Sequence, residues 1–137
     1  MKRYSLVEHT ADMGFIAYGK DKKELFSNAA FALFDIITEL SKVREAASWL
    51  VEVKAQDEIE LLVRWLNELL YLFDSEKVLL NRFDITELST VLIRAEVFGE
   101  VRDPLRHPVK TGVKSATYHM LEIVKNKYYH AQVILDI

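Results

Sequence analysis

Carboxylate groups lie close to both ends of this 137-residue chain. The chain ends in the apolar run Val133–Ile137, which is interrupted only by Asp136, so the Asp136 side chain neighbours the main-chain carboxylate of Ile137. Near the other end, Asp12 lies in a polar segment, residues 8–14, between two strand-like runs. If the fold joins these ends, three carboxylates meet with little nearby to neutralise them. Because like charges repel strongly at short distances, a cation would be their natural partner.

The kind of cation follows from the ligand atoms. Carboxylate oxygens suit a hard cation such as Ca²⁺, Mg²⁺ or Mn²⁺. The chain has no cysteine, which excludes a thiolate metal site. Each carboxylate also has a simpler interpretation. Asp12 or Thr10 could bond a neighbouring amide in the turn before Gly14, and Asp136 could belong to a solvated terminus.

A second group of polar side chains lies in the segment 113–119, which contains Lys114, Thr117 and His119. If this segment is a strand, Thr117 and His119 share one face and Lys114 lies on the other. A threonine and a histidine on one face could be functional. The simpler interpretation is an edge strand with a solvated face.

Several signals of catalysis are absent from the sequence. It contains no glycine-rich phosphate loop, no Gly-x-Ser-x-Gly elbow and no His-Glu-x-x-His helix. The histidines His107 and His130 have no carboxylate or second histidine at ligand spacing, so we expect both at the surface. With four histidines and no obvious nucleophile, stand-alone catalysis is poorly supported.

Composition limits the class of protein further. The length predicts one domain, residues 1–137. The net charge of -3 gives no global attraction to nucleic acid, so a nucleic-acid binder is disfavoured unless a local basic patch exists. No apolar run approaches the ~20 residues that cross a bilayer, and the first residues do not resemble a signal peptide. We therefore expect a cytoplasmic protein with no membrane partner.

The elements that must position these residues follow from periodicity. A capping box at Asp21–Glu24 predicts a helix over 22–40, and a second one at Asp57–Glu60 opens a helical stretch over 61–74. The second helix is apolar around most of its circumference, so it should be nearly surrounded. Alternating patterns predict strands over 4–6, 15–18, 48–55, 78–85, 90–101, 113–124 and 128–135. Together these helices and strands predict an α+β fold, with two helices packed on one face of a mainly antiparallel sheet.

Four segments together resemble the archease family. They are residues 8–14, 62–74, 113–119 and 133–137, in the right order and near the right spacing over essentially the whole chain. Each segment alone would be a modest signal. The one small departure is Ser115, where the family more often has alanine. The resemblance implies a small α+β fold, a strand-helix-strand-strand module elaborated by an insertion.

The resemblance also implies a function. Archeases act as protein cofactors of the RtcB-type RNA ligase in tRNA splicing and RNA repair, where they promote guanylylation of the ligase and repeated turnover. The chain would then be no enzyme itself, and would meet RNA only through the ligase. Carried over residue by residue, Asp12, Asp136 and the terminal carboxylate of Ile137 resemble the family's divalent metal site, with Ca²⁺ expected and Mg²⁺ or Mn²⁺ as alternatives. Three further residues look functional or partner-facing: His9, Lys114 and His119.

Two other functions remain open at this stage. One is a small metal-dependent phosphohydrolase or nucleotide-processing enzyme that uses the same carboxylates. The other is a chaperone-like or RNA-modification accessory module, which the small α+β architecture alone suggests. Turnover of nucleotides or RNA by the isolated protein would favour the enzyme, and activity that depends on added ligase would favour the activator.

Overall fold

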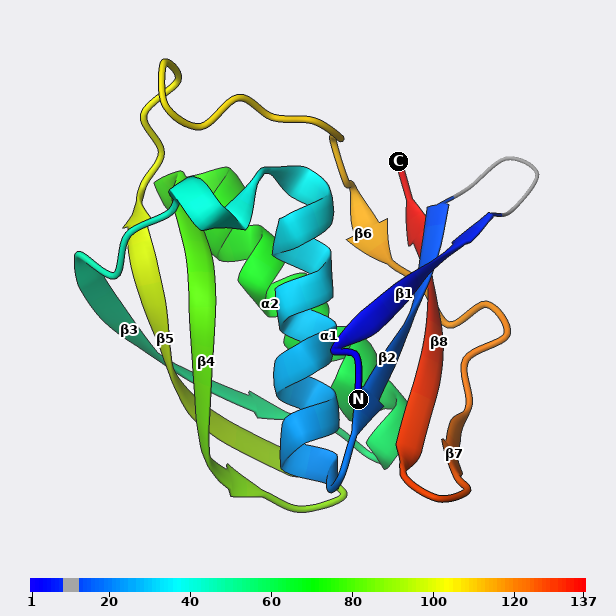
Figure 1. Cartoon of the computed structure of the whole chain (residues 1–137). Coiled ribbons are helices and arrows are strands. Elements are labelled where there is room, and N and C mark those ends of the chain that lie inside the picture. The colour runs from blue at the N-terminus through cyan, green and yellow to red at the C-terminus, as the bar shows by residue number, and fades with distance from the viewer. Residues whose placement is uncertain (9–12) are drawn as a thin grey trace.

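The computed structural model describes residues 1–8 and 13–137. Within these residues the chain forms two α-helices and two antiparallel sheets (Figure 1). The larger sheet has the order β1 (Tyr4–Glu8), β2 (Met13–Gly19), β8 (Tyr129–Asp136) and β6 (Ser115–Ala116), and β7 (Ile123–Lys125) also pairs with β8. The smaller sheet has the order β3 (Ala47–Lys54), β5 (Leu92–Val101) and β4 (Val78–Leu88).

Both helices begin directly after the predicted aspartates, which cap them. Helix α1 (Lys22–Ile37) is capped by Asp21 Oδ1, which accepts from the Glu24 amide at 2.8 Å. Helix α2 (Glu58–Glu76) is capped in the same way by Asp57. These bonds satisfy amides that have no partner within the helix. Helix α1 ends at Ile37, before the predicted residue 40, and a short 3₁₀ helix, Leu40–Lys42, follows it.

The helices lie between the two sheets (Figure 1). Helix α1 packs against β2 of the larger sheet and β4 of the smaller one. The α+β class, the two helices and the antiparallel pairing are confirmed, while the strands divide into two sheets where one was expected. The physical reason is that α1 buries side chains around most of its circumference, so it needs apolar cover on two sides. No helix within the described residues is long and apolar enough to cross a membrane.

Helix α2 is buried along the stretch that its sequence predicted. Trp65 is fully buried, and its indole Nε1 donates to the Phe26 carbonyl of α1 at 3.0 Å. Its ring also packs edge-on against Phe83 of β4. Toward the end of the helix Tyr71 is exposed, so the apolar stripe belongs to the core at Trp65 but not at Tyr71.

The segment 113–124 does not form the single strand that was predicted. Strand β6 covers only Ser115–Ala116, and β7 begins at Ile123. The chain leaves the sheet after Thr117, whose amide donates to the Ile134 carbonyl of β8. Met120 then adopts a left-handed backbone with φ of 56°, which an extended strand does not contain. Thr117 and His119 therefore do not share a strand face.

The prediction of a surface position for His107 is wrong. This histidine is fully buried, because the loop after β5 folds back over Glu100. The Asp103 amide donates to His107 Nδ1 at 2.9 Å, so the ring proton lies on Nε2 in the neutral form. Nε2 lies 3.1 Å from both the Lys42 carbonyl and the Glu100 carboxylate, which leaves both ring nitrogens paired. The other histidine of this kind, His130, is half-buried on β8.

Candidate functional site

The predicted carboxylates near the C-terminus stand at the end of β8. Leu135 is fully buried, whereas Asp136 is exposed and Ile137 is 44% exposed. The main chain of Asp136 is held in place, since Ser115 is its register partner and the Lys114 amide donates to its carbonyl at 2.7 Å. The apolar run is thus a core strand up to Leu135, and the end of this strand is hydrogen-bonded to the segment at β6.

Strand β2 lies along the other edge of β8. Met13 pairs with Leu135, so the residue after Asp12 in the sequence is the partner of the residue before Asp136. Two of the predicted site residues, His9 and Asp12, lie outside the described residues. Their part in the site stays a prediction. The structure does place β2, which begins directly after residue 12, beside β8, which ends at Asp136 (Figure 1).

Lys114 and His119 lie on either side of β6. Lys114 directly precedes the strand, is exposed, and its ammonium group makes no ion pair with any described residue. His119 follows the strand by three residues, is exposed, and its amide donates to the Thr117 hydroxyl at 3.3 Å. The main chain of Lys114 is therefore hydrogen-bonded to that of Asp136, and His119 lies in the turn that follows β6.

The chemistry of this strand end is that of an exposed anionic group. Asp136 makes no ion pair within residues 1–8 and 13–137. The same residues contain no group of three or more histidine, cysteine, aspartate or glutamate side chains placed to hold a metal ion. A metal site at this position would therefore need Asp12 as well as Asp136 and Ile137. Such a donor set, made only of carboxylate oxygens, fits a hard divalent cation.

Sequence reasoning missed one side chain that contacts this region. Asn67 of α2 accepts the Ala116 amide on Oδ1 at 2.8 Å and donates from Nδ2 to the Ala116 carbonyl at 3.2 Å. A signal was present in the sequence, because Asn67 is an asparagine in the interior of a mostly apolar helical stretch. Its partner on β6 could not be read from periodicity.

A buried ionic cluster was also missed. The Arg106 guanidinium donates to both oxygens of Glu100, at 2.7 and 3.0 Å, and the Arg44 amide donates to one of them at 2.6 Å. Hydrogen bonding to Arg106 lowers the pKa of Glu100 to about 2, although burial acts in the opposite direction. The carboxylate therefore stays ionised and fastens the loop after β5 to the segment after α1.

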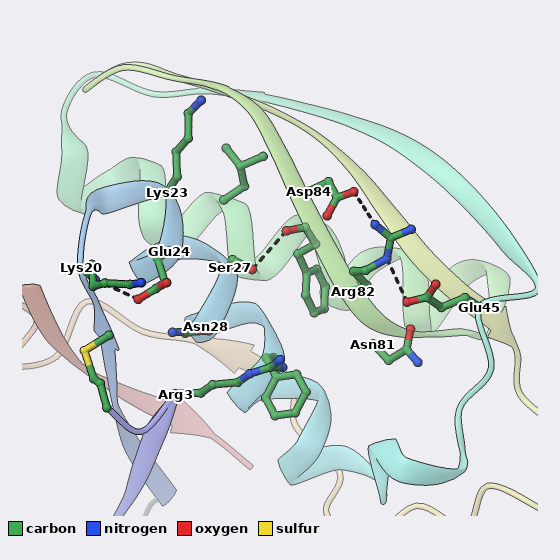
Figure 2. Close-up of a pocket in the computed structure, with 14 residues that line it drawn as sticks. Arg3, Lys20, Lys23, Glu24, Ser27, Asn28, Glu45, Asn81, Arg82 and Asp84 are labelled. Atoms are coloured by element: carbon green, nitrogen blue, oxygen red, sulfur yellow. Dashed lines mark hydrogen bonds and ion pairs between the residues drawn. The ribbon is translucent and has the colours of Figure 1, made fainter.

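An open groove of about 950 Å³ lies between α1, β4 and the N-terminal residues (Figure 2). None of the predicted site residues that the structure describes lines it. At one end Arg82 bonds Glu45 at 2.9 Å and Asp84 at 2.6 Å, so its charge is neutralised. Away from Arg82 the groove is lined by three cations, Arg3, Lys20 and Lys23, and by one carboxylate, Glu24, which accepts from the Lys20 amide at 2.9 Å. This part of the groove therefore has an excess of positive charge, although the chain has a net charge of -3.

Comparison with known proteins identifies the family. Residues 4–137 match the model of the Archease protein family (MTH1598/TM1083). A protein archease from Methanosarcina acetivorans is 40% identical over 141 residues, covering 99% of this chain and 97% of that protein. A protein archease from Methanothermobacter thermautotrophicus is 37% identical over 142 residues and covers 100% of both chains.

Two solved structures are similar to this fold. The solution structure of Methanobacterium thermoautotrophicum protein 1598 has a TM-score of 0.83 at 36% identity and covers 100% of both chains. A crystal structure from Thermotoga maritima, described as an archease and possible chaperone, has a TM-score of 0.67. It is 17% identical, covers 96% of this chain and 94% of that one, and so supports the fold alone. From the family match and the relatives together, the chain belongs to the archease family.

Proposed function

We propose that this protein is a non-catalytic activator of an RtcB-type RNA ligase in tRNA splicing and RNA repair. It would promote ligase guanylylation and multiple turnover through a divalent metal site. The observation that carries the proposal is the end of β8. There an exposed carboxylate without an ion pair among the described residues stands on a hydrogen-bonded strand beside β2. Membership of the archease family supports the choice of partner.

The metal site in this proposal consists of Asp12, Asp136 and the terminal carboxylate of Ile137. Calcium is the expected ion, with Mg²⁺ or Mn²⁺ as alternatives, because all three ligand groups are hard oxygen donors. A bound ion would supply positive charge at the strand end. Since Ca²⁺ takes six or more oxygen ligands, three groups leave positions open to water or to a group of the partner.

The partner-facing residues in this proposal are His9, Lys114 and His119. The amide of Lys114 bonds the Asp136 carbonyl and its side chain is exposed, which gives this region a cation that can pair with an acidic group of the ligase. The net charge of -3 agrees with a protein whose partner, and not itself, holds the RNA. We place the protein in the cytoplasm with the ligase, away from any membrane.

The proposal is tested by a guanylylation assay on a purified RtcB-type ligase. We expect faster formation of the ligase–guanylate adduct when this protein and Ca²⁺ or Mn²⁺ are added together. The isolated protein, incubated with nucleotides or RNA and the same metals, should release no product. Product release by the isolated protein would favour a metal-dependent phosphohydrolase or nucleotide-processing enzyme instead.

A further inference from the structure

Strand β6 is held on both of its sides, although it contains only two residues. On one side it pairs with β8, through the register pairs Ser115–Asp136 and Ala116–Leu135. On the other side the Asn67 amide of α2 bonds both main-chain groups of Ala116, as acceptor at 2.8 Å and as donor at 3.2 Å. The amide of Asn67 thus takes the place that the main chain of another strand would have.

Both of these bonds satisfy buried groups. Ala116 is only 4% exposed, and its N–H and C=O point to α2 and not to β8. Without the Asn67 amide the two main-chain groups would be buried with no partner, which is costly. The strand would then have to move outward to reach water, and its contacts with β8 would move with it.

The contacts between the β6 segment and β8 fix the position of the main chain at the candidate site. The Lys114 amide donates to the Asp136 carbonyl at 2.7 Å, and the Thr117 amide donates to the Ile134 carbonyl at 3.0 Å. The Thr117 hydroxyl adds a second bond to the Ile134 carbonyl at 2.8 Å. The main chain on either side of Ala116 is therefore bonded to β8, and Ala116 itself is bonded to the helix.

The helix supplies a rigid support. The residues beside Asn67 on α2, such as Leu66 and Leu70, are buried in the core. Asparagine is a poor helix former because its side chain competes for main-chain groups, so an apolar residue or alanine would favour this helix more. The polar side chain at position 67 is explained by its two hydrogen bonds to Ala116 of β6.

We infer that Asn67 is a positioning residue for the C-terminal site: through β6 it fixes the main chain that presents Asp136 and Ile137. The inference rests on the proposed metal site. Among the described residues Asn67 bonds Ala116, and it bonds neither Asp136 nor Ile137. Groups hydrogen-bonded directly to metal ligands act in this way, and their loss weakens metal affinity by roughly 10- to 100-fold. Asn67 acts one step further out, through Ala116, so we expect an effect at the lower end of this range.

The test compares Asn67→Ala with Asn28→Ala. Asn28 is a matched control, because it is also a helical asparagine that bonds a strand carbonyl, that of Tyr18 at 2.7 Å, but it lies on α1. Asn67→Asp is a second variant, which keeps an acceptor for the Ala116 amide and loses the donor. The readouts are calorimetric titration with Ca²⁺ or Mn²⁺ and hydrogen exchange at the Lys114 amide, which Asn67 does not bond.

We expect Asn67→Ala to weaken metal affinity by about tenfold or more and to speed exchange at the Lys114 amide by about tenfold. Asn67→Asp should be intermediate, and Asn28→Ala should leave both values unchanged. Unchanged exchange in Asn67→Ala, or faster exchange with unchanged metal affinity, would overturn the positioning role. If the unmodified protein binds no metal, the proposed metal site fails. The exchange rate at Lys114 then decides alone whether Asn67 fixes this strand end.

Discussion

At Asp136 the chain passes in one step from a fully buried residue to an exposed carboxylate. The burial of Leu135 was predictable from the apolar run. The exposure of Asp136 does not follow from strand alternation, because Val133, Ile134 and Leu135 are all buried. The sequence left open whether Asp136 belongs to a site or to a solvated terminus. The prediction for Asp12 stays a prediction, because residue 12 lies outside the described residues.

The Asp136 side chain is the most direct residue-scale target. We expect Asp136→Ala to weaken Ca²⁺ or Mn²⁺ binding by at least about tenfold, because the number of charged oxygens tunes the affinity of such sites. The free energy of unfolding of the metal-free protein should change by less than about 0.5 kcal/mol. Calorimetric titration and urea denaturation measure the two effects. Glu76→Ala is the control, an exposed carboxylate at the end of α2. Equal affinities in the two variants would remove Asp136 from the site.

Glu100 should make stability depend on acidic pH. Its pKa is lowered to about 2 in the folded protein, chiefly by Arg106, from 4.5 for the free side chain. The ionised form is therefore the one that folding favours. Its contribution is fully present above about pH 5 and is lost as the pH falls toward 2, with a total on the order of 3 kcal/mol.

The check on Glu100 is a comparison with Glu100→Gln by urea denaturation between pH 7 and pH 2.5. The difference in unfolding free energy between the two proteins should be largest at pH 7 and should shrink steadily below pH 5. A difference that stays constant across this range would show that the Glu100–Arg106 pair does not titrate as described.

At the scale of elements, contacts between residues close in the sequence were predictable, and contacts between distant residues were not. The caps at Asp21 and Asp57 bond residues three positions away, so their patterns were sufficient. Strand β6 is held by Asn67 and by Ile134, both far along the chain, and a two-residue strand carries no periodicity of its own. Periodicity alone therefore extended this strand too far.

The role of the carboxylate at the end of β8 can be tested by extending the chain. Residues appended after Ile137 would turn its terminal carboxylate into an amide, which loses the charge and keeps one weaker carbonyl ligand. We expect a C-terminal extension to weaken metal binding and ligase activation, and an N-terminal extension to be tolerated. The strand itself should persist in both, since Val133, Ile134 and Leu135 remain buried. Circular dichroism checks the strand. Full activation by the C-terminally extended protein would exclude the Ile137 carboxylate as a ligand.

At the scale of the whole molecule, the fold places its two notable surfaces apart. The groove reaches the start of α1 at Lys20 and Lys23, whereas the C-terminus lies at the opposite end of α1, beside β6 (Figure 1). The α+β class and the antiparallel strands were predictable because they follow from local patterns. The division into two sheets was not, since it depends on how one helix is covered from both sides.

Activation of the ligase can be measured as the number of ligated RNA products per ligase molecule. The ligase would be supplied with guanosine triphosphate, Mn²⁺ and an excess of RNA ends, with no addition, with this protein, or with its Asp136→Ala variant. We expect several products per ligase molecule with the unmodified protein, and no gain from the variant. Equal yields with and without the unmodified protein, or full activation by the variant, would contradict an activator that works through the carboxylates at the end of β8.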